Sequence, residues 1–118
     1  MKCFTLLLCA FGLLTAADRE GNFEIRFEPT AKLQTGVQVP FEIHITDALR
    51  KPLPDAKVTL QIEMPDHTHI RVFPAPATAA GVYLAKPVFS LAGEWDIYVE
   101  AHRNNEMSAR TIQFNVPE

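Results

Sequence analysis

Apolar and polar residues alternate strictly along residues 37–46. One face of this segment carries only apolar side chains, from Val37 to Ile45, and the other face is mostly polar. A period of two is typical of a strand that buries one of its faces. No helix-length segment of the sequence has apolar residues at three-four spacing, so the sequence predicts an all-β fold.

The same alternation returns in further segments, separated by proline, glycine or paired polar residues. We expect about seven strands, at residues 23–27, 37–46, 58–64, 82–85, 88–91, 95–102 and 112–116. Residues 47–55 are expected to form a turn, and residues 65–80 are the longest irregular region. The last two strands are expected to form a hairpin across residues 103–106. We expect such a set of strands to form an Ig-like antiparallel β-sandwich.

The first 17 residues predict a secretory signal peptide. Lys2 precedes an apolar run over residues 4–14, and small residues follow at positions 15–17. This order predicts cleavage after Ala17, which leaves a domain of residues 18–118 in the periplasm or outside the cell. The apolar run is shorter than the roughly 20 residues that span a bilayer, so we expect no transmembrane segment in the mature chain.

Both cysteines lie in the predicted signal peptide. Cys3 and Cys9 would be removed with it, so the mature domain is expected to hold no disulfide, although its compartment is oxidising. Three leucines precede Cys9 and resemble a lipoprotein box. Lipidation there would leave several apolar residues at the start of the mature protein, so simple cleavage is favoured.

Size and charge limit the classes of function. A length of 118 residues is enough for one hydrophobic core and too short for two domains. Acidic residues outnumber basic ones by 14 to 11, and the absence of a basic patch disfavours a nucleic-acid role. No G-x-S-x-G motif, phosphate loop or mature cysteine nucleophile is present, so we expect a protein that is not an enzyme.

Histidine and methionine residues gather in one segment of the predicted domain. Met64, His67 and His69 lie within six positions of one another. Imidazole and thioether together suit copper better than magnesium or calcium, which prefer oxygen ligands. In an extended loop, His67 and His69 would point the same way and converge on one ion. The third ligand is expected to be Met64, or else His102 or Met107 if the last hairpin turn lies at the same end of the sandwich.

A second interpretation of the same segment needs no metal. Met64 is then the last core residue of its strand, while His67 and His69 are solvated loop residues. The domain would instead bind a protein partner through a sheet face or through residues 65–80. Residues 70–73 would provide an apolar contact for that partner, or would form an edge strand that closes the core. The edge strand is favoured.

Other conspicuous residues are expected to have structural roles. Trp95, the single tryptophan, opens a strand and is expected to anchor the core. Gly93 is expected to permit the turn before that strand. His44 lies on the polar face of its strand and is expected to be a surface residue.

Three short motifs, in this order, resemble the YtkA-like or FixH-like exported domains. They are the segment from Met64 to His69, the step Gly81-Val82-Tyr83, and the segment 89–97. The resemblance covers roughly residues 23–116 and implies an Ig-like β-sandwich of the cell envelope. It also implies that Met64, His67 and His69 of the first motif are copper ligands. The glycines and aromatic residues of the other two motifs would have structural roles; these are Gly81, Tyr83, Gly93 and Trp95.

The resemblance further implies a role in metal handling. Such domains occur alone or attached to proteins of metal handling and respiratory oxidase assembly, so an envelope partner of that kind is expected. Two positions depart from the usual pattern: Leu91 stands where many relatives have methionine, and Ile70 and Arg71 stand where relatives commonly have Gly-Met. Both departures remove soft ligands, and Arg71 adds a positive charge that would repel a cation.

Overall fold

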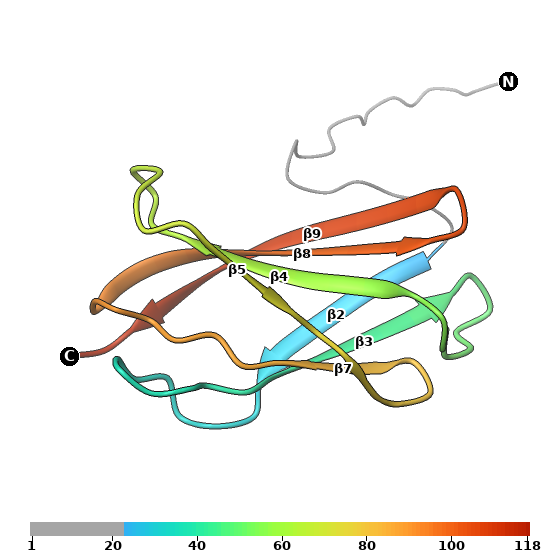
Figure 1. The fold of residues 1–118 in the computed structure, drawn as a ribbon, viewed down its shortest axis with the longest axis horizontal. Helices are drawn as coiled ribbons and strands as arrows, with labels where there is room; N and C mark the ends of the chain where they lie inside the picture. Colours follow the sequence, from blue (N-terminus) through green and yellow to red (C-terminus); the bar gives the residue numbers. More distant parts are fainter. Residues whose placement is uncertain (1–22) are drawn as a thin grey trace, which may run out of the picture.

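The computed structural model describes residues 23–118, which form two four-stranded antiparallel sheets (Figure 1). One sheet has the order β2 (Phe23–Pro29), β3 (Phe41–Asp47), β7 (Val82–Ala85) and β6 (Ala77–Ala79). The other has the order β5 (Arg71–Pro74), β4 (Lys57–Glu63), β8 (Gly93–Arg103) and β9 (Glu106–Val116). The predicted all-β sandwich is confirmed, whereas the predicted signal peptide lies outside the described residues. Within residues 23–118 the structure has no helix that is long and apolar enough to cross a membrane.

Residues that alternate between apolar and polar in the sequence face alternately into the core and toward the surface of the sandwich. In β3, the side chains of Phe41, Ile43 and Ile45 are fully buried, and the residues between them are half-buried. The inward faces of both sheets meet in one core, in which Trp95 and Tyr83 are the largest fully buried side chains. Burial of this apolar surface is the main force that holds the two sheets together.

Prolines shorten one strand that the alternation indicates and replace another by isolated bridges. The strand expected from residue 37 begins only after Pro40, and the segment 88–91, which follows Pro87, forms no strand. Proline has no N–H group to donate to a sheet, so isolated bridges replace a continuous ladder here. Val37 is accordingly 44% exposed, although the alternation put it on the buried face.

The region expected to be irregular, residues 65–80, contains two short edge strands. β5 is the outer strand of one sheet, and β6 is the outer strand of the other. The favoured edge strand is confirmed over Arg71–Pro74, but of its expected core residues only Phe73 packs on the core, because Ile70 and Val72 are exposed. The three-residue strand β6 was not expected from the sequence, and it brings the total to eight strands in the described part of the chain.

The register of β8 with its two neighbours decides which residues can meet. β8 and β9 form the expected hairpin and pair along their full length. On its other side β8 runs antiparallel to β4, with Glu63 opposite Asp96 and Lys57 opposite His102. The end of β4 therefore lies beside the start of β8, and the start of β4 lies beside the end of β8.

Side chains of β9 tie the two sheets together along one side of the sandwich. The hydroxyl of Ser108 donates a hydrogen bond to the carbonyl of Phe23 at 2.8 Å. The guanidinium of Arg110 donates to the carbonyl of Ile25 at 3.0 Å. These bonds satisfy two carbonyls of β2 and close this side.

Candidate metal centre

Three of the five candidate ligands lie together at one end of the sandwich. Met64 follows β4 directly, and His67 and His69 belong to the connection between β4 and β5 (Figure 1). We refer to residues 64–70 as the histidine loop. Because β4 and β8 are antiparallel, this loop lies at the end of the sheet where β8 begins, close to Trp95.

The other two candidate ligands lie at the opposite end. His102 and Met107 face each other across the β8–β9 hairpin, and His102 is also opposite Lys57, the first residue of β4. The whole of β4, seven residues, separates this pair from Met64, which corresponds to roughly 20 Å of extended chain. The condition under which His102 or Met107 would be the third ligand is therefore not met, and these two residues do not belong to the site. Neighbouring antiparallel strands run in opposite directions, so they end at opposite edges of the sheet.

Backbone hydrogen bonds close the histidine loop into a compact turn. The N–H of His67 donates to the carbonyl of Met64 at 2.8 Å, and the N–H of Met64 donates to the carbonyl of Thr68 at 3.0 Å. His67 and His69 have φ angles of 66° and 58°, both in the left-handed region. The loop is thus not extended, and the alternation expected to align the two imidazoles does not apply.

Glu63, the last residue of β4, holds the ring of His67. Nδ1 of His67 contacts the Glu63 carboxylate, and Glu63 is mostly buried while the imidazole is 84% exposed. The hydrogen bond and the charge of Glu63 raise the pKa of His67. Since a carboxylate accepts a proton from Nδ1, the neutral ring presents its lone pair at Nε2, which faces no described partner.

His69 is oriented in a similar way by a chain of two hydrogen bonds. Oγ1 of Thr68 donates to the Asp66 carboxylate at 2.6 Å, and this bond lowers the pKa of Asp66. Because the hydroxyl proton goes to Asp66, Oγ1 accepts the Nδ1 proton of His69 at 2.9 Å. The lone pair of the neutral His69 ring is therefore also at Nε2.

The ring of His69 also stands edge-on against Trp95, with centroids 6.3 Å apart and an interplanar angle of 75°. Trp95 is fully buried, packs against Phe89, and donates its indole N–H to the carbonyl of Leu91 at 3.1 Å. The expectation that Trp95 anchors the core is met. Its contact with His69 was not foreseen, because it depends on the register of β4 against β8.

Met64 lies between the loop and the core. Its side chain is partly buried and packs on the core cluster, as the metal-free interpretation expects. Its terminal methyl group lies 3.4 Å from where a Cβ on Gly93 would be, and Gly93 has a φ of 129°. Met64 is therefore only partly withdrawn from solvent.

The donors of this loop fit a soft metal better than a hard one. In residues 23–118 no group of three or more His, Cys, Asp or Glu side chains is placed to hold a metal ion. A site at the histidine loop would therefore need the thioether of Met64 beside the two Nε2 atoms, which is a donor set that suits copper. The hydrogen bond from His67 to Glu63 matches the arrangement in which a carboxylate orients a ligating histidine.

The two antiparallel sheets and the histidine-methionine loop at one end define a small β-sandwich module. The chain belongs to the YtkA-like family, whose sequence pattern matches residues 17–100. This match includes the histidine loop and most of β8, so the predicted YtkA-like resemblance is confirmed. A search of curated proteins and a search of solved structures each found no significant match.

Proposed function

We propose that this protein is an exported, non-catalytic binding module that takes up copper through Nε2 of His67 and His69, with the thioether of Met64 as third ligand. The observation that carries the proposal is the hydrogen bonding of the two rings. Each imidazole uses Nδ1 for a bond to a neighbouring side chain and leaves Nε2 available. The two rings belong to one closed turn, so a single loop carries both nitrogens.

The charges near the loop are compatible with a bound cation. Glu63 and Asp96 occupy opposite positions in the neighbouring strands β4 and β8, and both supply negative charge near His67. Arg71 is the residue that was expected to repel a metal. Its guanidinium carbon stands 5.5 Å from the ring centroid of Phe73, which is an alternative site for its charge.

Competition for Cu(I) against a chelator of known affinity tests this proposal. The purified protein is expected to bind one equivalent, and the double variant His67→Ala, His69→Ala is expected to bind none. The matched control is His44→Ala, His102→Ala, which removes two histidines that lie outside the loop. Retained binding by the first double variant, or equal losses in both, would refute the assignment of the site.

A metal-free interaction with an envelope protein is the second candidate. What favours it is the exposure of Ile70 and Val72, at 50% and 59%, beside and on the edge strand β5. Alanine substitution at both positions would abolish capture of such a partner while leaving thermal stability unchanged. Val72 lies in β5, outside the histidine loop, so Val72→Ala alone is expected to leave copper binding unchanged and separates the two functions.

A further inference from the structure

The two long sides of the sandwich are closed in different ways. One side is tied by side chains of β9, as described above, while on the other side the backbone itself crosses from β5 to β6. The N–H of Ala75 donates to the carbonyl of Val58 in one sheet, and the carbonyl of Pro76 accepts from the N–H of Leu84 in the other, both at 3.0 Å. The short segment between β5 and β6 thus connects the two sheets on this side.

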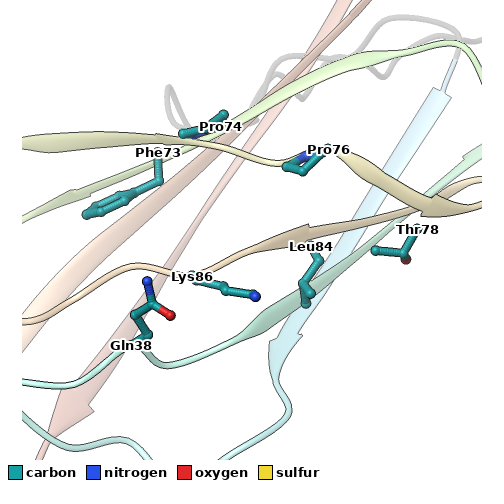
Figure 2. Close-up of a pocket in the computed structure, with 7 residues that line it drawn as sticks. All are labelled: Gln38, Phe73, Pro74, Pro76, Thr78, Leu84 and Lys86. Atoms are coloured by element: carbon teal, nitrogen blue, oxygen red, sulfur yellow. The ribbon is translucent and has the colours of Figure 1, made fainter.

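A cavity of about 470 Å³ opens beside this crossing. Figure 2 shows its lining residues: Gln38, Phe73, Pro74, Pro76, Thr78, Leu84 and Lys86. Its wall is mainly apolar, because the phenylalanine ring, the two proline rings and the leucine side chain supply most of it. We refer to it as the crossing cavity. Cavities of roughly 300–1,000 Å³ with apolar walls and a few polar groups are typical of sites for small ligands.

The charged groups at the crossing cavity are cationic. Lys86 lines the cavity, and the guanidinium of Arg71 stands over the ring of Phe73, another lining residue. No carboxylate is among the lining residues, and within the described part of the chain Lys86 forms no ion pair. The molecule as a whole has a net charge of −3. Lys86 is the one charged residue among those that line the cavity. The carboxylate of Glu42, which lies in β3 opposite Leu84, is bonded to His44. The positive charge of Lys86 would attract an anion.

We propose that the crossing cavity binds a single amphiphilic molecule that has an apolar chain and an anionic head group. The chain would lie against Phe73 and Leu84, which are both only half-buried, and would release water from their surfaces. The head group would meet the ammonium of Lys86 and the amide N–H₂ of Gln38. A recess between two sheet edges admits one molecule from solution and does not admit the flat surface of a bilayer.

An NMR titration with sodium laurate, kept below its micelle concentration, tests the proposal. Saturable shifts are expected at the backbone amides of Thr78, Leu84 and Lys86, with a stoichiometry of one. Acetate, which has the head group alone, and dodecyltrimethylammonium, which has the same chain and the opposite charge, are expected to leave these amides unshifted. Equal binding of the cationic amphiphile, or laurate shifts spread over the whole surface, would overturn the proposal.

Charge variants separate a specific contact from general attraction. Lys86→Glu is expected to weaken laurate binding by about tenfold or more, as for the loss of a charge-assisted hydrogen bond. Lys57→Glu makes the same change of net charge at the start of β4 and is expected to bind as the unchanged protein does. Equal weakening by both variants would contradict the proposal, as would sedimentation with phosphatidylglycerol vesicles in the absence of laurate binding. Unchanged melting temperatures would show that both variants are folded.

Discussion

Gly81 is the residue at which the backbone has least freedom to accept a side chain. Its φ is 74°, and a Cβ built there would lie 2.5 Å from Cβ of Pro52 and 3.1 Å from the carbonyl oxygen of Ile45. Gly81→Ala is therefore expected to lower the free energy of unfolding by about 3 kcal/mol, from left-handed strain plus overpacking. Urea denaturation measures this change.

A second glycine provides the control for Gly81. Gly36 has a φ of 78°, but nothing lies within 4 Å of a Cβ added there. Gly36→Ala is expected to cost about 1 kcal/mol, from the left-handed conformation alone. If the two variants lost the same stability, the contact of Gly81 with Pro52 would not be what makes glycine necessary.

The titration of His67 is expected to depend on Glu63. Glu63 raises the pKa of this imidazole in the folded protein. A raised folded pKa gives stability that is fully present below the unfolded pKa, about 6.5, and is lost as pH rises through the folded value. The contribution is small because the ring is exposed. In an NMR titration, Glu63→Gln is expected to move the midpoint of His67 to lower pH, and an unmoved midpoint would contradict the assigned hydrogen bond.

Protons and copper should compete for the same ring. Copper affinity is therefore expected to fall as the pH is lowered through the raised pKa of His67, since metal binding requires the neutral imidazole. The chelator competition repeated at several pH values measures this. An affinity independent of pH between 5 and 8 would exclude a histidine ligand.

At this scale the sequence predicted some roles and missed others. The grouping of Met64, His67 and His69 was visible from spacing alone, and so was the burial of Trp95. The bond between His67 and Glu63 was not, because it requires the left-handed turn at His67. Neither spacing nor residue type indicates such a φ angle at a histidine.

Among the strands, the edge strand β5 contains neighbouring residues of opposite burial, one packed on the core and one exposed. Phe73 lies opposite the fully buried Leu60 and packs on the core, whereas Val72 is 59% exposed. Phe73→Ala is expected to lower the free energy of unfolding by about 2 kcal/mol, and Val72→Ala by less than about 0.5 kcal/mol. Equal losses in urea denaturation would show that β5 is not an edge strand with one inward side chain.

Strands whose alternation is uninterrupted were predictable, and those next to prolines were not. The inward residues of β4 and β8 follow the period-two pattern throughout, and their strand bounds differ little from the expected ones. At Pro40 and Pro87 the missing N–H ends the ladder although the apolar pattern continues. The antiparallel pairing of β4 with β8 could not be predicted from local sequence pattern either. This pairing places His102 and Met107 at the opposite end of the sheet from the candidate site.

In the whole molecule, the two proposed sites lie at different places on one sandwich. The histidine loop lies at the end of β4, and the crossing cavity lies on the side where β5 passes to β6. Variants at one site are therefore expected to leave the other unchanged.

Export is a property of the whole chain that can be tested directly. The signal peptide predicted over residues 1–17 has the order of cation, apolar run and small residues that export requires. Protein isolated from the periplasmic fraction is expected to have an intact mass that corresponds to residues 18–118. A mass that retains residues 1–17, or one that carries a lipid at Cys9, would contradict simple cleavage after Ala17.

The histidine loop is proposed to bind copper beside Trp95, the single tryptophan of the chain. The most direct test is a titration with Cu(I) and with Cu(II), followed by the fluorescence of Trp95 and by the NMR signals of the histidine ring protons. Because His69 stands against Trp95, one equivalent is expected to change the emission and to shift the rings of His67 and His69 but not those of His44 and His102. Unchanged emission, or shifts confined to His44 and His102, would show that the histidine loop does not bind copper.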